Sequence, residues 1–161
     1  MATIADERRV AQRGGQFLTF KLGREEYALE ILRIQEIRGY SRITPIPHTP
    51  AYLKGVINLR GTVVPVVDLR CRLGMPETAY SRFTAIVVVT IGTKVTGLLV
   101  DEVSDVVDIQ DTEIQAPPEL GGQADARSIA GLAHVGGRLI VLLSLDAIVR
   151  DDPAAPLPNP A

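Results

Sequence analysis

Short runs of apolar residues that alternate with polar ones, separated by glycines, recur along the whole chain. Paired runs of this kind around a tight glycine turn predict β-hairpins. Residues 17–22 form the first run and end at a turn at Gly23-Arg24. Three further pairs of runs follow, residues 56–60 with 63–67 around Gly61-Thr62, 83–91 with 94–100 around Gly92-Thr93, and 129–135 with 138–143 around Gly136-Gly137.

Helix signals are few in comparison. Residues 68–73 follow a possible cap at Asp68, and residues 144–149 follow one at Ser144. Pro65 inside the run 63–67 predicts either an edge strand or a bulge, because proline cannot donate to a strand ladder. The number of short strands favours an all-β fold of small barrels over a layered α/β fold.

The two ends of the chain differ from its middle. Residues 1–15 are polar and charged and end in Gly14-Gly15, which predicts a flexible N-terminal arm. Residues 151–161 contain four prolines, so they cannot continue a helix and have little to bury. The folded part is therefore expected at residues 16–150, followed by a flexible proline-rich tail.

The middle of the chain repeats itself in order. Residues 55–69 align without a gap on residues 131–145, so that Gly55 meets Gly131 and Asp68 meets Ser144. Upstream, residues 17–37 align on residues 86–106, with a connector between the two blocks about seven residues longer in the second copy. This internal duplication predicts two similar small barrels in one chain, with an interface between them and an arrangement that allows interleaving.

Composition narrows the function classes. The net charge is −2 and aromatic residues make up only 4%, which gives no general attraction to nucleic acid or anionic lipid and few stacking surfaces. A single cysteine allows no disulfide within the chain, as in a reducing compartment. No apolar run is long enough to cross a bilayer, and the N-terminus has no apolar signal core. We therefore expect a cytoplasmic protein.

Residues able to carry catalysis or bind metal do not assemble into any recognised pattern. His48 lies between prolines and His134 in a predicted strand, and neither has a ligand-type neighbour at metal-binding spacing. Cys71 falls in a predicted helix and is best explained as a buried thiol. The acidic residues between Asp101 and Glu113 lack the spacing of a calcium loop. The chain is thus predicted to be no enzyme and to need no cofactor or metal.

Charge is nevertheless uneven along the chain. Residues 33–72 carry seven basic and two acidic side chains, whereas residues 95–126 carry eight acidic side chains and no lysine or arginine. Such polarity favours head-to-tail contacts with a similar molecule through electrostatic complementarity.

Four segments, in the right order, resemble the CheW family of bacterial chemotaxis coupling proteins. They are residues 20–40, which include Ile34-Gln35-Glu36-Ile37-Arg38-Gly39-Tyr40, residues 49–70, which include the specific Asn58-Leu59-Arg60-Gly61 signature, residues 95–106, and residues 129–132. The resemblance extends from about Gln16 to Val149, nearly all of the expected folded part.

This resemblance implies two SH3-like five-stranded β-barrels with a few short helices. It also implies a scaffold or adaptor that joins the cytoplasmic tip of methyl-accepting chemoreceptors to the histidine kinase CheA, whose regulatory domain is itself CheW-like. Pairing with other CheW-like domains in rings beneath a chemoreceptor array is a further expectation. The protein would lie at membrane-associated arrays without inserting into the membrane.

Site residues carry over from the family only where a segment matches. Those expected to contact receptor or kinase, or to shape such contacts, are Ile34, Glu36, Gly55, Arg60, Val87, Gly97, Leu120 and Gly131. Glu36 and Arg60 could form an ion pair across a groove wall, or Arg60 could reach the receptor with its planar fork. Core packing is an equal alternative for Ile34, and the glycines more readily permit turns or close backbone approach. Leu120 is aliphatic where the family can carry an aromatic ring.

Alternative functions remain at this point. A small-barrel nucleic-acid-binding protein would use the basic half of the chain, although the acidic half and the scarce aromatics oppose it. A hydrolase would have to use Cys71 or His134. A CheA fragment shares the expected fold, but no kinase ATP-binding segment is present, and no receiver segment follows as in the CheV arrangement.

Overall fold

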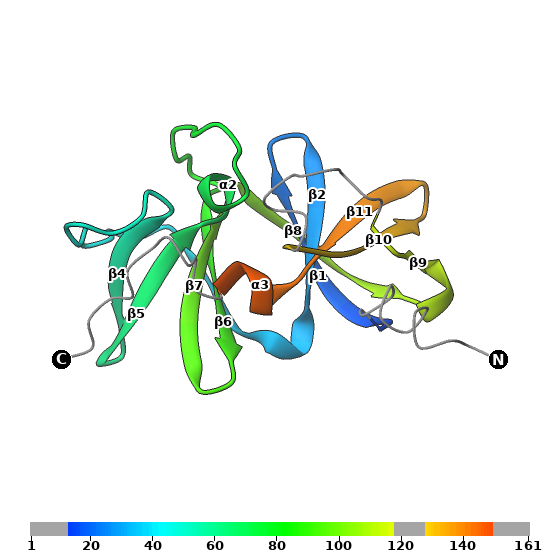
Figure 1. Cartoon of the computed structure of the whole chain (residues 1–161), viewed down its shortest axis with the longest axis horizontal. Helices are drawn as coiled ribbons and strands as arrows, with labels where there is room; N and C mark the ends of the chain where they lie inside the picture. The colour runs from blue at the N-terminus through cyan, green and yellow to red at the C-terminus, as the bar shows by residue number, and fades with distance from the viewer. Residues whose placement is uncertain (1–12, 118–127, 150–161) are drawn as a thin grey trace.

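The computed structural model describes residues 13–117 and 128–149, and within them strands dominate (Figure 1). The elements in chain order are β1 (Gly15–Leu22), β2 (Glu25–Glu30), the 3-10 turn η1 (Ile31–Arg33), β3 (Ile34–Gly39), β4 (Leu53–Leu59), β5 (Thr62–Asp68), α2 (Leu69–Arg72), β6 (Ala85–Ile91), β7 (Lys94–Val100), β8 (Glu102–Ile109), the 3-10 turn η2 (Asp111–Glu113), β9 (Ile114–Gln115), β10 (Ile129–Val135), β11 (Arg138–Leu143) and α3 (Leu145–Val149). The predicted all-β fold with few helices is confirmed.

The strands form two sheets, which lie side by side in Figure 1. Sheet A has the order β8-β1-β2-β11-β10-β9, and sheet B has the order β3-β6-β7-β5-β4. In sheet B the chain leaves edge strand β3 and Thr44 pairs with Val56 of the opposite edge strand β4. In sheet A the chain leaves edge strand β8 through η2 and forms β9 at the opposite edge. Each sheet therefore curls on itself like a small barrel, which leaves little free edge.

The duplication seen in the sequence has a structural counterpart. Hairpins β1–β2 and β6–β7 occupy the same place in their sheets, and so do hairpins β4–β5 and β10–β11. The matched strands β2 and β7 each pair in parallel with a matched strand, β11 and β5 respectively. Edge strands β3 and β8 also share a register shift, at Ile34/Glu36 and opposite Leu18/Phe20.

The two copies are interleaved rather than separate. We call residues 15–72 repeat 1 and residues 85–149 repeat 2. Sheet A combines hairpin β1–β2 of repeat 1 with β8–β11 of repeat 2, and sheet B combines hairpin β6–β7 of repeat 2 with β3–β5 of repeat 1. The chain crosses from one sheet to the other at η1, and again at Asp101 between β7 and β8.

Three apolar clusters stabilise this arrangement. One fills sheet A around Phe17, Ile140 and Leu142, and another fills sheet B around Val64, Ile86 and Val88. The largest lies between the sheets and includes Phe20, Leu22, Leu29, Val87, Val89, Leu98 and Ile148. The first five residues of strand β6, 85–89, are all apolar because they face the inter-sheet cluster and the sheet B cluster in turn.

Both predicted helices are confirmed, and so is the strand that contains Pro65, but of the two alternatives for that strand the edge position is wrong. The β4–β5 ladder does contain a bulge, between Leu53 and Gly55 of β4 and not at Pro65. The Asp68 carboxylate accepts a hydrogen bond from the Cys71 amide at the start of α2, and Ser144 Oγ accepts one from the Ala147 amide in α3. Strand β5, which contains Pro65, is an inner strand and not an edge. Pairing of β5 with β7 begins only at Val66, so Pro65 has no ladder bond to donate on that side. The predicted flexible ends fall almost entirely outside the described residues.

Candidate partner-binding site

An ion pair joins strand β3 to the turn between β4 and β5. Arg60 Nη2 lies 2.5 Å from Glu36 Oε1, and Arg38 Nη1 lies 3.9 Å from Glu36 Oε2. The Arg60 hydrogen bond lowers the pKa of the Glu36 carboxyl, which stays ionised. The Arg60 side chain remains 65% exposed, so its guanidinium can contact a partner without leaving the pair. The two residues expected from the signature segments are therefore brought together.

Local backbone geometry explains how Arg60 is presented. Arg60 has φ 51° and Gly61 has φ 87°, the two positive values that a tight hairpin turn of the mirror-image type requires. Asn58 Oδ1 accepts a hydrogen bond of 2.8 Å from the Gly61 amide and closes the turn. The Asn58-Leu59-Arg60-Gly61 signature thus encodes a turn that holds one arginine outward.

Strand β3 separates the roles of Ile34 and Glu36. Ile34 pairs with Val89 and Glu36 with Val88, so one extra residue lies between them and their side chains face opposite sides of the sheet. Ile34 is half-buried and packs against the inter-sheet cluster, which supports the core alternative for this residue. Glu36 instead lies on the side from which Arg60 approaches.

The predicted glycines permit close packing and expose no side chain. A Cβ at Gly55 would lie 2.0 Å from the Thr44 carbonyl oxygen, and one at Gly131 would lie 3.1 Å from that of Gln115. These are the places where the chain crosses back over β4 and β10, so the matched glycines serve the same purpose in the two sheets. A Cβ at Gly97 would lie 2.9 Å from a methyl carbon of Ile86.

Two further predicted residues add no exposed contact. Val87 is fully buried in the inter-sheet cluster, where its side chain fixes how the sheets pack. Leu120 lies outside the described residues. Of the predicted set, only Glu36 and Arg60 form an exposed site; Ile34, Gly55, Val87, Gly97 and Gly131 support the frame that carries it.

Sequence reasoning missed several exposed apolar side chains around sheet B. Leu32 in η1 is 93% exposed and Val63, just after the Arg60 turn, is 64% exposed. At the other end of the sheet, the rings of Tyr40 and Tyr80 lie 4.9 Å apart, and Phe83 is half exposed with the Arg82 guanidinium over its ring. The sequence offered one signal for these exposed residues, because Leu32 breaks the alternation of apolar and polar residues in its segment. Val63, Tyr40, Tyr80 and Phe83 have the pattern of ordinary strand or loop residues.

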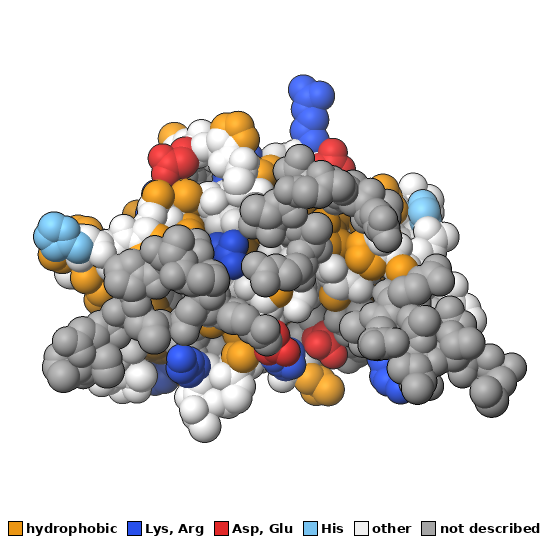
Figure 2. Space-filling model, viewed as in Figure 1, with side chains coloured by type: hydrophobic (Ala, Val, Ile, Leu, Met, Phe, Trp, Pro, Cys, Tyr) orange, Lys and Arg blue, Asp and Glu red, His pale blue; other side chains and the backbone are white. Residues whose placement is uncertain are grey.

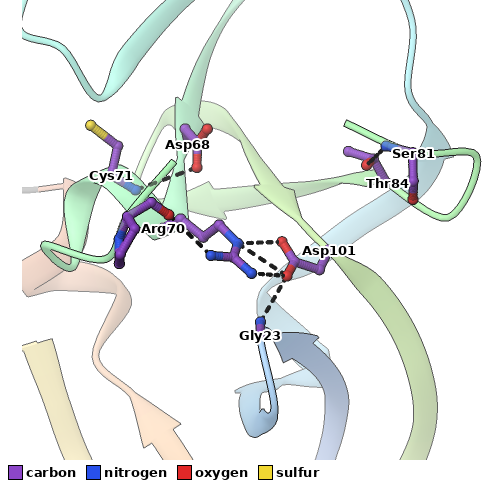
Figure 3. A network of polar contacts seen from close by, with 8 residues as sticks. Gly23, Asp68, Arg70, Cys71, Ser81, Thr84 and Asp101 are labelled. Atoms are coloured by element: carbon purple, nitrogen blue, oxygen red, sulfur yellow. Dashed lines mark hydrogen bonds and ion pairs between the residues drawn. The ribbon is translucent and has the colours of Figure 1, made fainter. Parts of the chain in front are cut away.

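A polar network around Arg70 and Asp101 lies where the two sheets meet (Figure 3). Arg70 of α2 grips Asp101 through Nε, 2.8 Å from Oδ1, and Nη2, 2.7 Å from Oδ2, while the Gly23 amide donates to Asp101 Oδ2 over 2.7 Å. Burial raises the pKa of Asp101, but the Arg70 and Gly23 hydrogen bonds outweigh it and the net pKa is lowered. A cavity of about 300 Å³ lies beside this network and is lined in part by Tyr80 and Phe83.

Catalytic or metal-binding groupings are missing from the part of the chain that the structure describes. No cluster of three or more His, Cys, Asp or Glu side chains there could hold a metal ion. The two histidine side chains lie at opposite ends of the molecule (Figure 2). Burial raises the pKa of the half-buried Cys71 thiol, which disfavours the nucleophilic thiolate. No helix among residues 13–117 and 128–149 is long and apolar enough to cross a membrane.

The fold and the site define a class of protein, an all-β protein of two interleaved small barrels whose Asn58-Leu59-Arg60-Gly61 turn presents an arginine held by Glu36. Comparison with known proteins agrees. The family model described as "CheW-like domain" matches residues 16–152. The chain is 38% identical to the chemotaxis protein CheW of Klebsiella aerogenes, covering 92% of this chain and 89% of that protein, and 39% identical to the one of Rhizobium meliloti, covering 84% and 87%.

A solved structure shows the same architecture. The crystal structure of the scaffolding protein TtCheW from Thermoanaerobacter tengcongensis matches with a TM-score of 0.83 at 32% identity, covering 91% of this chain and 99% of that one. The chain belongs to the CheW-like family. The prediction of a non-catalytic chemotaxis adaptor is confirmed at this level, and the nucleic-acid-binding alternative is not supported.

Proposed function

We propose that this protein physically couples methyl-accepting chemoreceptors to the histidine kinase CheA, through two separate surfaces of sheet B. The observation that carries the proposal is the Glu36–Arg60 pair, which holds an exposed guanidinium in a fixed place. We call Glu36, Arg38, Arg60 and Val63 the Arg60 surface. The protein would act in the cytoplasm at membrane-associated arrays, with residues 16–150 as its CheW-like domain.

The Arg60 surface fits a receptor helix hairpin. Its two arginines outnumber its one carboxylate, so it favours an acidic partner, and Val63 adds an exposed apolar contact. A guanidinium fork pairs with a carboxylate through two parallel hydrogen bonds, which fixes orientation as well as position. Glu36 already holds that fork on one side, so less freedom is lost when a receptor carboxylate approaches from the solvent side.

A second surface at the other end of the sheet fits the kinase. We call Tyr40, Tyr80, Arg82 and Phe83 the aromatic surface. Strand β5 joins the two surfaces: Val63 is its second residue, and Asp68 is its last. Asp68 accepts a hydrogen bond from the Tyr80 hydroxyl. The length of strand between them places the two surfaces about 15–20 Å apart. Aromatic and arginine side chains are enriched in interface centres, and a folded partner such as the CheA regulatory domain can bury them together.

Contacts with other CheW-like domains extend the proposal. Strand β8 is an edge strand of sheet A and carries Asp105 and Asp108 exposed, whereas the arginines at positions 38, 42 and 60 belong to the sheet B half. An acidic edge on one molecule and a basic sheet on the next would favour head-to-tail contacts, as a ring requires.

The experiment is a binding titration of purified protein with a receptor tip fragment and, separately, with the CheA regulatory domain. Arg60→Ala is expected to weaken receptor binding about tenfold and leave kinase binding unchanged, and Phe83→Ala is expected to do the reverse. Arg24→Ala is the matched control, because Arg24 is an exposed turn arginine of sheet A. Equal loss in Arg60→Ala and Arg24→Ala would reject the Arg60 surface, and binding to neither partner by the folded parent protein would reject the coupling function.

A further inference from the structure

The connection between α2 and β6, residues 74–84, is an exposed loop that carries much of the aromatic surface (Figure 1). Tyr80, Arg82 and Phe83 all belong to it. An exposed loop with few buried side chains is ordinarily mobile, and a mobile loop loses freedom when it binds a partner, which lowers affinity. How this loop is held therefore decides whether the aromatic surface is formed before a partner arrives.

Polar contacts anchor the first residues of the loop to helix α2 and strand β4. The Met75 amide donates to the Arg70 carbonyl oxygen over 2.8 Å, and Arg70 Nη1 donates to the Pro76 carbonyl oxygen over 3.0 Å. Lys54 Nζ of β4 lies 2.6 Å from Glu77 Oε1. The start of the loop is thus held without any contribution from its tip, residues 78–83.

The tip lies over an open space. The cavity of about 300 Å³ has Tyr80 and Phe83 of the tip on one side and Leu99 and Asp101 on the other. Because this space is open, close packing does not hold the tip on that side. The hydrogen bond of 2.8 Å from the Ser81 amide to Thr84 Oγ1 is local and shapes the end of the loop (Figure 3). A contact of longer range is needed to fix the tip in place.

The Tyr80 side chain makes such a contact with sheet B. Its hydroxyl donates a hydrogen bond of 3.1 Å to Asp68 Oδ2, and its ring lies 4.9 Å from the ring of Tyr40. Burial, together with the nearby Asp68 charge, raises the pKa of the Tyr80 hydroxyl. The hydroxyl therefore stays protonated at neutral pH and remains a donor.

Asp68 does more than a helix cap requires. Its Oδ1 accepts from the Cys71 amide at the start of α2 (Figure 3), and at the matched position Ser144 caps α3 with a single hydroxyl oxygen. The Asp68 residue is only 6% exposed, and a buried carboxylate is unfavourable unless its oxygens are hydrogen-bonded. A serine would serve the cap alone, so the second oxygen, which Tyr80 uses, accounts for an aspartate here.

We propose that Asp68 and the Tyr80 hydroxyl are positioning groups for kinase binding, because their contact holds the tip of the loop so that Arg82 and Phe83 are presented together. The inference rests on the proposed binding of the CheA regulatory domain at the aromatic surface. Phe83 is 51% exposed, and the Arg82 guanidinium lies 4.9 Å from the centre of its ring. A tip that is ordered before binding loses less freedom on binding, which raises affinity.

Two substitutions remove the contact from its opposite ends. Tyr80→Phe removes the donor and keeps the ring beside Tyr40. Asp68→Ser removes the acceptor but keeps an oxygen for the cap of α2, as Ser144 does for α3. Tyr27→Phe is the matched control, since it removes a hydroxyl from a half-buried tyrosine of sheet A.

The order of the tip is measured in the free protein by NMR relaxation of its backbone amides. We expect order parameters of about 0.85 for residues 78–83 in the parent and in Tyr27→Phe, and below about 0.6 in Tyr80→Phe and Asp68→Ser. Titration with the CheA regulatory domain should show about fivefold weaker binding in each of the latter two, with receptor binding unchanged. The double variant should bind as weakly as either single variant, because both act through one contact.

Two outcomes would overturn the inference. One is a tip as ordered in Tyr80→Phe and Asp68→Ser as in the parent. The other is weaker kinase binding in Tyr80→Phe with parental binding in Asp68→Ser, which would mean that the hydroxyl contacts the kinase itself.

Phe83→Ala separates a failure of this inference from a failure of the proposed function. If Phe83→Ala binds the kinase domain as the parent does, the aromatic surface is wrong and the inference falls with it. If Phe83→Ala loses affinity while Tyr80→Phe and Asp68→Ser keep it, the proposed function stands and the positioning role alone is rejected.

Discussion

Sheets A and B have the same strand arrangement and the same kind of buried core, but they differ in the residues at their exposed turns. Each contains a seven-residue buried cluster, a parallel contact between matched strands, and a glycine that lets the chain cross closely over a strand, Gly131 in sheet A and Gly55 in sheet B. At the turn between the matched strands, however, sheet A has Gly136-Gly137 and sheet B has Arg60-Gly61. The positions that match maintain the fold, and the positions that differ are where binding is expected.

Polar contacts differ between the sheets in the same way. In sheet A, Arg138 joins Glu26 and Asp105, and the Thr19 hydroxyl donates to Asp105 over 2.5 Å, so that four strands are tied by one network. In sheet B, Arg60 contacts Glu36 from an exposed turn. The Arg138–Glu26 contact is the less exposed of the two pairs, with side chains 38% and 16% exposed against 65% and 26% for Arg60 and Glu36, so it contributes more to stability. The Arg60 pair adds little stability and is available to a partner.

The largest expected difference in the free energy of unfolding is between alanine substitutions at the two matched glycines. Gly55→Ala forces a Cβ against the Thr44 backbone, with contacts of 2.0 and 2.6 Å, at φ 147°. A Cβ at Gly131 would lie 3.0 Å from a methyl carbon of Ile114, which can move, and 3.1 Å from the Gln115 carbonyl oxygen, a much milder backbone contact than the one at Gly55. We expect Gly55→Ala to lower the free energy of unfolding by about 3 kcal/mol or more and Gly131→Ala by about 1–2 kcal/mol. Urea unfolding followed by circular dichroism measures both, and equal losses would contradict the difference in backbone approach.

The next largest difference in stability is expected between glutamine substitutions at Glu26 and at Glu36. Glu26→Gln removes the charge that holds Arg138 and is expected to cost about 1–2 kcal/mol, at the lower end because Arg138 is partly solvated. Glu36→Gln, in the exposed pair, should leave the urea midpoint unchanged and affect only partner binding. A midpoint shift in Glu36→Gln as large as that in Glu26→Gln would show that the sheet B pair is structural.

Acid should remove the stabilising contribution of the paired carboxylates of sheet A. The Arg138 hydrogen bond lowers the pKa of Glu26, and the Thr19 hydrogen bond lowers that of Asp105. A carboxyl whose pKa is lower in the folded state stabilises the protein above its unfolded pKa and loses that contribution as pH falls through its folded pKa. Stability should thus be constant near neutrality and fall below about pH 5.

Unfolding in urea at a series of pH values measures this dependence. The variant Glu26→Gln should show a lower stability at pH 7 and a shallower fall toward acid, because one of the titrating groups is gone. Parallel curves for the parent and the variant would mean that Glu26 titrates alike in the folded and unfolded states, contrary to its contact with Arg138.

The hairpins and the internal duplication could be predicted from the sequence because both depend on local residue patterns. Glycine turns between alternating runs located the hairpins, and the gapless match of Gly55 with Gly131 revealed the duplication. The exchange of hairpins was left open, because strand partners far apart in sequence leave no periodic signal. The edge position predicted from Pro65 was wrong for the same reason. A proline fits an inner strand where the neighbouring strand does not pair with it, and the start of that pairing, at Val66, depends on tertiary structure.

The candidate site was predicted only in part. Glu36 and Arg60 were found together through the family resemblance, and their contact followed from the register shift at Gln35, which no residue pattern announces. Val87 was also carried over from the family but is buried, so a family match does not separate contact residues from core residues. The aromatic surface escaped notice because Tyr40 and Tyr80 are far apart in sequence and meet only through folding.

The smallest expected stability effect is the most informative about function. Arg60→Gly turns the sheet B hairpin into a copy of the Gly136-Gly137 turn of sheet A, in which both residues also have positive φ. The substitution removes an exposed ion pair, and it also replaces a residue whose φ of 51° is uncommon outside glycine. These two changes oppose each other, so the urea midpoint should not move measurably.

Receptor binding should nevertheless fall as much in Arg60→Gly as in Arg60→Ala, because both lack the guanidinium. The reciprocal change, Gly136→Arg, tests whether the arginine is sufficient: sheet A lacks a glutamate placed like Glu36 to fix it, since the matched residue Asp105 is already engaged by Arg138 and Thr19. We expect Gly136→Arg to restore no binding to Arg60→Gly. Restored binding would show that any arginine on a hairpin turn suffices, and that the held geometry of the Glu36–Arg60 pair is irrelevant to recognition.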